Sequence, residues 1–361
     1  MINTYIPFLR QNEKKNLIDC LKTNFVSTAG PQVKKFEKKF CKIYKFKYAV
    51  ALNSGTSALH LALLVNGIGK NDFVATPSYT FAATANAIRY TGAEPHFFDC
   101  NEDLFLDLEN LENYFKKKNS KKLIKGILPV ITMGKKINFN EYEKFAKKNS
   151  LKIIFDAAAC HDPKIIKQKN QSNSIFCFSF NGNKTITSGS GGILATNSKF
   201  ISNKARLLST VGKNRSNYDY QEIGYNYKMT NLQASLGLSQ LNSLNTILIK
   251  KRKIFNYYKT KINKNKNFSI IYDKRYVNWV FAIKLKKKNH FNKVKEMFNK
   301  KNIQLDYFWK PLHLQKPYRG FKKENLDICE NIWNKILILP SHPNLRKIHQ
   351  KKICEIINNL K

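Results

Sequence analysis

Several features that would place a chain in a particular class are missing from this sequence. It has no run of 18 apolar residues, so no transmembrane helix is expected. Its first residues lack the basic start and long apolar core of a secretory signal. Its seven cysteines form no C-x-x-C pair, which indicates neither a zinc site nor a disulfide framework. We therefore expect a cytoplasmic protein with reduced thiols, no metal site and no membrane partner.

Acidic residues are scarce. The chain has 64 lysines and arginines against 24 aspartates and glutamates, a formal net charge of +40 over 361 residues. Such a charge raises the hypothesis of nucleic-acid binding, because basic groups neutralise phosphates. The basic residues are, however, mostly lysines spread along the chain with many asparagines and isoleucines, the bias of AT-rich codons. We interpret them as solvated surface lysines that attract small anions such as sugar nucleotides, with no nucleic-acid partner.

Short apolar segments alternate with amphipathic ones over the first two thirds of the chain. Strands are predicted at residues 48–52, 72–76, 94–98, 123–131, 152–156, 174–178 and 192–196. Helices are predicted at residues 10–24, 31–46, 56–65, 81–90 and 140–149. This alternation favours an α/β fold with a mostly parallel sheet and helices on both faces.

The pattern changes after about residue 235. A long helix is predicted at residues 236–258, followed by a strand at 277–285 and helices at 291–300 and 347–360. These elements indicate a smaller α+β domain. Patches of lysine and asparagine at 116–122 and 261–267 are interpreted as exposed turns.

The most informative segment is residues 179–192, in which Lys184 stands among small polar residues and glycines between two strands. Burial there would lower the pKa of Lys184 and leave its amine free to form a Schiff base with a carbonyl compound. The alternative from the local sequence is one more surface lysine.

Three further groups of residues follow predicted strands. Thr56 and Ser57 open a helix after Gly55, a place where a phosphate can bind, although an ordinary helix cap explains them as well. Phe81 follows the next strand and suits stacking on a flat ring or core packing. Asp156 ends an apolar strand, where a protonated ring nitrogen would be a partner and a helix cap is the alternative. Together with a lysine, these are the groups that pyridoxal 5′-phosphate requires.

The chain resembles the DegT/DnrJ/StrS family of sugar aminotransferases over nearly its whole length. The segments that carry the resemblance are residues 52–61, 77–81, 86–95, 156–158, 178–184 and 222–233. The resemblance implies a fold type I aminotransferase, with a large domain at 1–240 around a mostly parallel, seven-stranded sheet and a small α+β domain at 241–361. It also implies a homodimer with shared active sites.

The same resemblance assigns roles to residues. Lys184 would bond the cofactor and act as catalytic base, and Asp156 would pair with the pyridinium nitrogen. Phe81 would stack on the ring. The phosphate would be held by Thr56, Ser57 and Ser179, together with Asn226 of the neighbouring subunit. Weaker matches, at Trp309, His313 and Lys228, would lie near the substrate.

The members that the chain most resembles aminate C4 of nucleotide-linked 4-keto-6-deoxy sugars for surface glycans, with glutamate as the expected amino donor. The chain departs from the family pattern at Ala159, where Gln, His or Glu is usual, and at Lys228, where Arg is usual. A C3-directed aminotransferase and a catalytically impaired homologue with a regulatory role therefore remain alternatives. A sugar dehydratase is disfavoured by Lys184, because the dehydratases of this family have histidine there.

Overall fold

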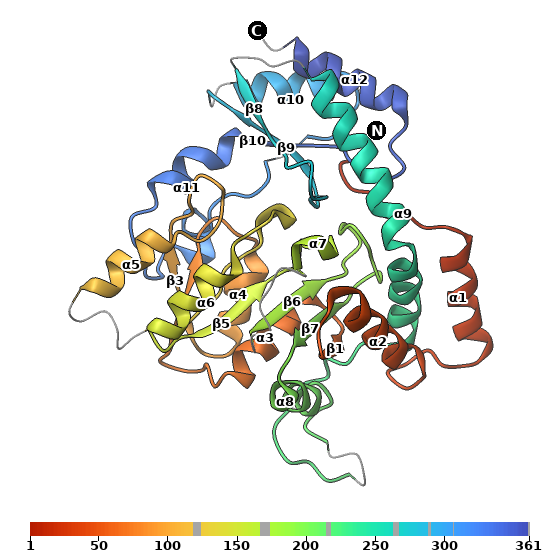
Figure 1. Ribbon diagram of the computed structural model, residues 1–361, viewed down its shortest axis with the longest axis vertical. Coiled ribbons are helices and arrows are strands. Elements are labelled where there is room, and N and C mark those ends of the chain that lie inside the picture. Colours follow the sequence, from red (N-terminus) through yellow and green to blue (C-terminus); the bar gives the residue numbers. More distant parts are fainter. Residues whose placement is uncertain are drawn as a thin grey trace.

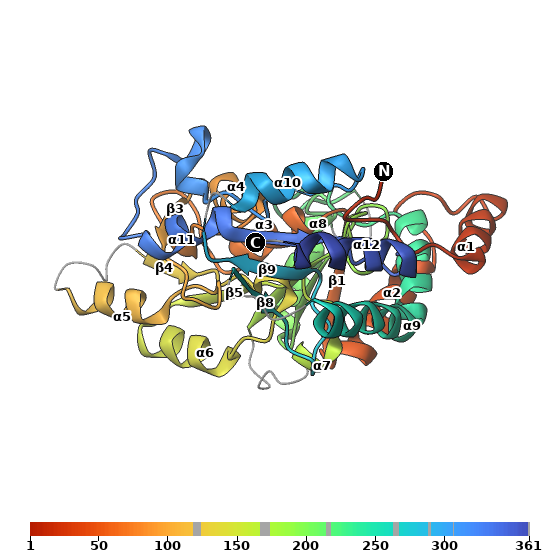
Figure 2. The same cartoon turned by 90° about the horizontal axis from the view of Figure 1, so that it is seen from above.

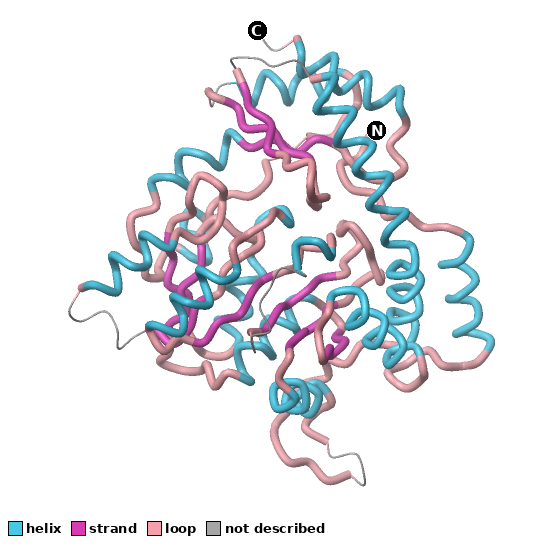
Figure 3. Tube along the Cα trace, viewed as in Figure 1, coloured by secondary structure: helices cyan, strands magenta, loops and turns pink. Residues whose placement is uncertain are grey.

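Two β-sheets organise the computed structural model, which describes residues 1–117, 124–166, 174–213, 218–262, 267–287, 290–305 and 307–359 (Figures 1 and 3). The larger sheet has the strand order β1-β7-β6-β5-β4-β2-β3 and the smaller one β10-β9-β8. The strands are β1 (Tyr48–Leu52), β2 (Phe73–Pro77), β3 (Glu94–Phe98), β4 (Ile124–Ile127), β5 (Lys152–Asp156), β6 (Ile175–Ser179), β7 (Gly192–Thr196), β8 (Phe268–Ile271), β9 (Phe281–Leu285) and β10 (Ile336–Leu339).

The larger sheet is mostly parallel, as the sequence predicted. Strands β2, β3, β4, β5 and β6 pair in parallel, and β7 runs antiparallel to both β6 and β1. Strand β7 is therefore the one reversed strand of this sheet within the described chain. The carboxyl ends of the parallel strands meet at one edge, which is where ligands bind in such folds.

Helices cover both faces of this sheet. The α-helices are α1 (Gln11–Lys22), α2 (Gln32–Tyr44), α3 (Gly55–Val65), α4 (Ala82–Tyr90), α5 (Leu108–Lys116), α6 (Phe139–Lys148), α7 (Pro163–Ile166), α8 (Lys199–Ser209), α9 (Asn231–Lys261), α10 (His290–Lys300), α11 (Asp327–Ile332) and α12 (Lys347–Asn358). Side chains alternate between the faces of a strand. In β6, Phe176 and Phe178 pack with α2 and α6, whereas Ile175 and Cys177 pack with α3 and α8.

The long helix α9 connects the two sheets (Figure 1). Its first half packs on α1 and α2, and its second half packs with α12 beside the smaller sheet. Seen from above, α5 and α6 lie at one end of the molecule and α1 and α9 at the other (Figure 2). The boundary predicted at residue 240 falls inside α9, so the division into 1–240 and 241–361 stays a prediction.

The N-terminal segment contacts both parts of the molecule. Ile2 forms a parallel bridge with Ile303, which follows α10. Glu13 of α1 is 1% exposed and accepts hydrogen bonds from Ser239 and Gln240 of α9, each 3.1 Å long. These bonds satisfy a carboxylate that would be costly to bury alone.

Two predicted strands are shorter in the structure. Strand β4 ends at Ile127, because Pro129 lacks the N–H group that a continued ladder would need. Strand β9 begins at Phe281, because the N–H of Trp279 donates instead to the carbonyl of Met133, at 2.8 Å. Most of the two lysine-asparagine patches lies outside the described residues.

Two findings concern what the described chain does not contain. None of its helices is both long and apolar enough to cross a membrane. Within the same residues, no group of three or more His, Cys, Asp or Glu side chains is placed to hold a metal ion.

Strand β1 is an edge strand that is held by a carboxylate from α2. Glu37 accepts the N–H of Ala51 at 2.8 Å and pairs with the guanidinium of Arg206 in α8 through two hydrogen bonds of 3.1 and 3.0 Å. The same guanidinium donates to the carbonyl of Ala49. This cluster satisfies backbone groups that an edge strand leaves unpaired.

Replacement of Glu37 should therefore destabilise the protein. We expect Glu37→Ala to lower the free energy of unfolding by about 2 kcal/mol, because it leaves the Ala51 N–H and Arg206 without their acceptor. Chemical denaturation measures this loss. The control is Glu355→Ala, which removes an exposed i,i+4 pair with Lys351 and should cost less than about 0.5 kcal/mol. Equal losses in the two variants would contradict the role of Glu37.

Candidate active site

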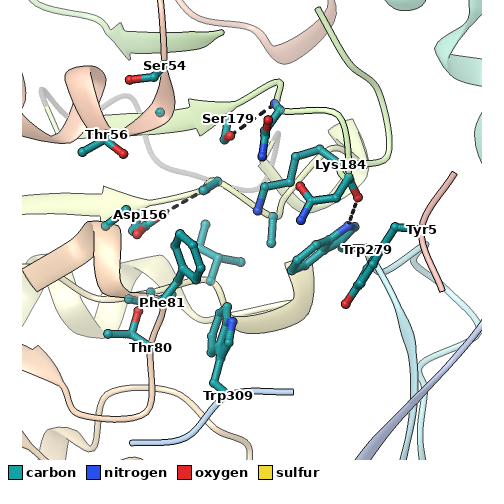
Figure 4. A pocket seen from close by; sticks show the side chains of 18 of the residues that line it. Tyr5, Ser54, Thr56, Thr80, Phe81, Asp156, Ser179, Lys184, Trp279 and Trp309 are labelled. Carbon is teal, nitrogen blue, oxygen red and sulfur yellow. Dashed lines mark hydrogen bonds between the residues drawn. The ribbon is translucent and has the colours of Figure 1, made fainter. Parts of the chain in front are cut away.

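A cavity of about 460 Å³ lies at the carboxyl ends of the parallel strands (Figure 4). Its walls come from the ends of β5 and β6, the start of α3, the loop before α4, the turn between β6 and β7, and segments near the smaller sheet. Six of the residues singled out in the sequence line it together: Thr56, Phe81, Asp156, Ser179, Lys184 and Trp309. Four others, Ser57, Asn226, Lys228 and His313, are not among its lining residues.

Lys184 lies in the loop of residues 180–191 that joins β6 to β7. Its N–H donates to the carbonyl of Asn181 at 3.0 Å, which closes a turn over residues 181–184, and the N–H of Phe180 donates to the carbonyl of Gly191 at 2.8 Å at the base of the loop. The residue as a whole is half-buried, but the surrounding protein desolvates its amine. This burial lowers the pKa of Lys184 to about 8, although the charge of Asp156 acts in the opposite direction.

Asp156 ends strand β5 and is 5% exposed. One carboxylate oxygen accepts the N–H of Ala158 at 3.0 Å, and the other accepts the hydroxyl of Thr84 at 2.8 Å. Burial raises the pKa of Asp156, while these hydrogen bonds and the charge of Lys184 lower it in part. The cavity thus contains a desolvated carboxylate and a desolvated amine.

A turn that can hold an anion stands beside them. Helix α3 begins at Gly55, and the hydroxyl of Ser54 caps it by accepting the N–H of Ser57 at 3.0 Å. A Cβ at Gly55 would lie 2.8 Å from the Cβ of Ser179, so only glycine lets this turn approach the end of β6. The free N–H groups and the dipole of a helix start, next to the Ser179 hydroxyl, suit a phosphate.

Ser57 has a different place from the one expected. Its hydroxyl donates to Asn53 Oδ1 at 2.6 Å, inside the turn and not toward the cavity. The side chain that faces the cavity from the cap of this helix is Ser54. The sequence reasoning missed Ser54, although a serine before a glycine at a helix start is a recognisable cap signal.

Aromatic side chains form the other walls. Phe81 precedes α4 and is 59% exposed, and Trp309 faces it from the segment after α10. Trp279 and Tyr5 stand next to Lys184 in Figure 4, stacked on each other with ring centroids 5.4 Å apart. Neither residue was singled out in the sequence. Both lie about 100 residues or more from Lys184 in the chain, and no local motif marks them.

Three expected residues lie behind the cavity wall or outside it. Asn226 is exposed, and its carbonyl accepts a hydrogen bond of 3.3 Å from the Asn53 side chain. Lys228 forms a bridge with Leu52 at the end of β1. His313 is 3% exposed. Its Nδ1 accepts the hydroxyl of Ser78 and its Nε2 donates to Glu330, at 2.7 and 2.8 Å, so it is enclosed by protein partners.

Comparisons with known proteins agree over the full length of the chain. The family model of the DegT/DnrJ/EryC1/StrS aminotransferases matches residues 7–358. The chain is 32% identical over 368 residues to GDP-perosamine synthase of Caulobacter vibrioides, covering 99% of this chain and 98% of the relative. It is 30% identical over 365 residues to EpsN of Bacillus subtilis, which is named as a pyridoxal phosphate-dependent aminotransferase, covering 98% and 94%.

A solved structure gives the same picture. The structure of Helicobacter pylori PseC, an aminotransferase involved in the biosynthesis of pseudoaminic acid, superimposes with a TM-score of 0.87 at 25% identity. The match covers 99% of this chain and 98% of that one. The fold expected from the sequence, a mostly parallel sheet domain with a smaller α+β part in the fold type I arrangement, is thereby confirmed.

The lowered pKa of Lys184 predicts a pH-dependent reactivity. In the cofactor-free protein, labelling of Lys184 by an amine-specific reagent should rise with pH around a midpoint of about 8, because only the neutral amine reacts. In denatured protein the midpoint should be near the ordinary value of about 10.4. In Asp156→Asn it should move below the wild-type value, because the neighbouring negative charge is gone. Mass spectrometry at a series of pH values measures the three midpoints, and equal midpoints in folded and denatured protein would contradict desolvation.

Proposed function

This chain belongs to the DegT/DnrJ/EryC1/StrS aminotransferase family, and on that premise we propose that it transfers an amino group from glutamate to C4 of a nucleotide-linked 4-keto-6-deoxy sugar. The protein is a pyridoxal 5′-phosphate-dependent sugar aminotransferase, as the family and its named members indicate. The observation that supports amino transfer at this site is the cavity in which the Lys184 amine and the Asp156 carboxylate are buried beside an anion-binding turn.

The residues of the cavity fit this cofactor. The close approach of Gly55 to Ser179 forms a cradle for its phosphate, with Thr56 at the start of α3. Asp156 would pair with the ring nitrogen, which would offset the cost of burying the carboxylate. Phe81 would stack on the ring. When bound, pyridoxal phosphate supplies an electron sink for the carbanion that forms at the donor's α-carbon.

Lys184 would act in two ways. Its amine would bond the cofactor in the resting enzyme and would be released when the donor amine takes its place. The released Nζ would then remove the proton from the donor's α-carbon, and in the second half of the reaction it would return a proton to C4 of the sugar. A pKa of about 8 keeps part of this amine neutral near neutral pH. Glutamate and the keto sugar would thus yield 2-oxoglutarate and the amino sugar.

Support for the sugar substrate comes from the relatives and from the walls of the cavity. A relative whose match covers 99% of the chain is named as a GDP-perosamine synthase. Trp309, Tyr307 and Phe308 give one side of the cavity flat apolar surfaces, which suit the C–H faces of a sugar ring. A product of this type would serve the synthesis of surface glycans.

A second copy of the chain would complete the site. Lys184 is the only lysine or arginine among the described residues that line the cavity, although a nucleotide diphosphate and a dicarboxylate donor both need cations. Exposed apolar side chains stand on the segment between α8 and α9, where Tyr218 is 84% and Ile223 94% exposed. We propose a homodimer in which this segment brings Asn226 and Lys228 to the neighbouring site. His313 does not line the cavity, so any effect of His313 on the substrate would be indirect, through its hydrogen bond with Ser78.

The proposed location is the cytoplasm. All seven cysteines are free thiols in the structure, which agrees with a reducing compartment.

The role of Lys184 can be tested by covalent trapping. The purified protein should be yellow, and borohydride should bleach it while fixing the cofactor to Lys184, as peptide mass spectrometry would show. Lys184→Ala should lose at least about 10³-fold in kcat, because the amine both bonds the cofactor and moves the proton. Activity would be assayed with L-glutamate and a panel of GDP-, UDP- and dTDP-linked 4-keto-6-deoxy sugars.

Lys251 is the matched control for this test. It is also buried, with a pKa lowered to about 7 by burial, but its amine donates to two backbone carbonyls. Cofactor fixed to Lys251, or an active Lys184→Ala enzyme, would refute the role of Lys184.

The shared site predicts complementation between two inactive variants. Lys184→Ala and Asn226→Ala should each have little activity alone, because each spoils both sites of its own dimer. After subunit exchange, half of the dimers are hybrids with one intact site, so activity should return to about a quarter of the wild-type value. Activity assays after mixing measure this recovery, and size-exclusion chromatography checks the dimer. Mixtures that stay inactive although hybrids form would contradict the shared site.

A further inference from the structure

Trp279 contacts the amine of Lys184 through the face of its ring. The distance from Lys184 Nζ to the Trp279 ring centroid is 4.0 Å (Figure 4). An ammonium at this distance over an indole face is attracted by the quadrupole of the neutral ring, whose face is electron-rich. The contact is formed between residues of distant segments, since Trp279 precedes strand β9 near the smaller sheet.

The same side chain also holds the backbone of the lysine turn. Its Nε1–H donates to the carbonyl of Asn183, the residue directly before Lys184, at 2.7 Å. Asn183 itself is exposed, so this bond reaches across the rim of the cavity from the small-sheet side. Trp279 therefore contacts the amine of Lys184 through its ring face and, through its ring N–H, the carbonyl of the residue that precedes Lys184.

Trp279 is itself held from three sides. Its backbone N–H donates to Met133, its carbonyl accepts the amine of Lys251 at 2.9 Å, and its ring stacks on Tyr5 at an interplanar angle of 24°. The residue is 6% exposed. A side chain fixed in this way loses little entropy when it positions another group.

We propose that Trp279 is a positioning residue for the reaction, which holds the Lys184 amine over its ring and fixes the lysine turn through the Asn183 carbonyl. This inference rests on the role proposed above for Lys184. A long lysine side chain has several freely rotating bonds, and a proton transfer requires its amine at one place beside the reacting carbon. The contact with the Trp279 ring keeps the amine in the cavity that Asp156 also lines.

A purely structural role for Trp279 predicts something else. In that case the residue would only fill space between the lysine turn and the smaller sheet, and its replacement would lower stability and leave the chemical step as it was. Two quantities of the half-reaction with the donor separate the two roles: its limiting rate and the donor concentration that gives half of that rate. A positioning role predicts a lower limiting rate at an unchanged half-saturating concentration, whereas a structural role leaves the limiting rate unchanged.

The test uses the holoenzyme of wild type, Trp279→Leu, Trp279→Phe and Trp333→Leu. Trp333→Leu is the matched control, because it removes a partly buried tryptophan from the same part of the molecule. Trp333 does not itself line the cavity and packs on one lining residue, Tyr307, with ring centroids 5.1 Å apart. Stopped-flow spectroscopy records how fast L-glutamate bleaches the visible band of each protein. Borohydride trapping identifies the labelled lysine, and thermal unfolding compares the four folds.

We expect Trp279→Leu to lower the limiting rate by about tenfold or more, with an unchanged half-saturating concentration of glutamate, because a small displacement of a catalytic group costs rate and not binding. Trp279→Phe keeps a ring face and loses the N–H, so its rate should lie between those of Trp279→Leu and wild type. Trp333→Leu should react like wild type.

Each other outcome has one meaning. If Trp279→Leu carries the label on Lys184 and keeps the wild-type limiting rate, the inference is overturned and the proposed function stands. If Trp279→Leu does not fold, Trp279→Phe decides, and a wild-type rate there overturns the inference. If wild type is not labelled on Lys184, the role proposed for that lysine fails and the inference fails with it.

Discussion

The burial of a positive and a negative group in one cavity is the constraint on which the active site depends. Neither the amine of Lys184 nor the carboxylate of Asp156 would be stable there alone, because desolvation disfavours both charged forms. Each partly offsets the cost of the other. The two groups lie together because strands β5 and β6 are parallel neighbours in the sheet. Asp156 ends β5, and the loop with Lys184 follows the end of β6. Close packing of Gly55 against Ser179 then sets the anion turn of α3 beside the pair.

The order of elements and half of the site could be predicted from the sequence, for a local reason. Strands β1, β3, β5 and β7 have the predicted bounds, because an apolar run of five residues between turn signals leaves few alternatives. Thr56, Asp156, Ser179 and Lys184 each follow or end such a strand, and parallel strands bring their carboxyl ends together. Position along the strand, together with the resemblance to the family, was enough to predict that these residues share one cavity.

The other half of the site depends on contacts between distant segments. Tyr5 and Trp279 lie beside Lys184 in the structure but far from it in the sequence, one before it and one after it, and no local pattern indicates their stacking. His313 looked like a substrate residue from its segment, yet Ser78 and Glu330 enclose it. The expected phosphate role of Ser57 stays a prediction: its hydroxyl donates to Asn53, while the neighbouring Ser54 lines the cavity. The identity of a single residue does not indicate which distant residues will contact it in the folded chain.

The two hydrogen bonds donated by the Lys251 amine bear on how Trp279 is supported beside the active site. Its amine donates to the carbonyls of Trp279 and Ser341, which belong to the segments beside β9 and β10, while the residue itself stands on α9. A neutral amine has two N–H bonds, and two are all that these carbonyls use. With a pKa of about 7, Lys251 can lose its third proton near neutral pH and keep both hydrogen bonds. The two hydrogen bonds to the Trp279 and Ser341 carbonyls can therefore form in both protonation states of Lys251, although they are stronger while the amine is charged, so that loss of this proton weakens the support of Trp279 without removing it.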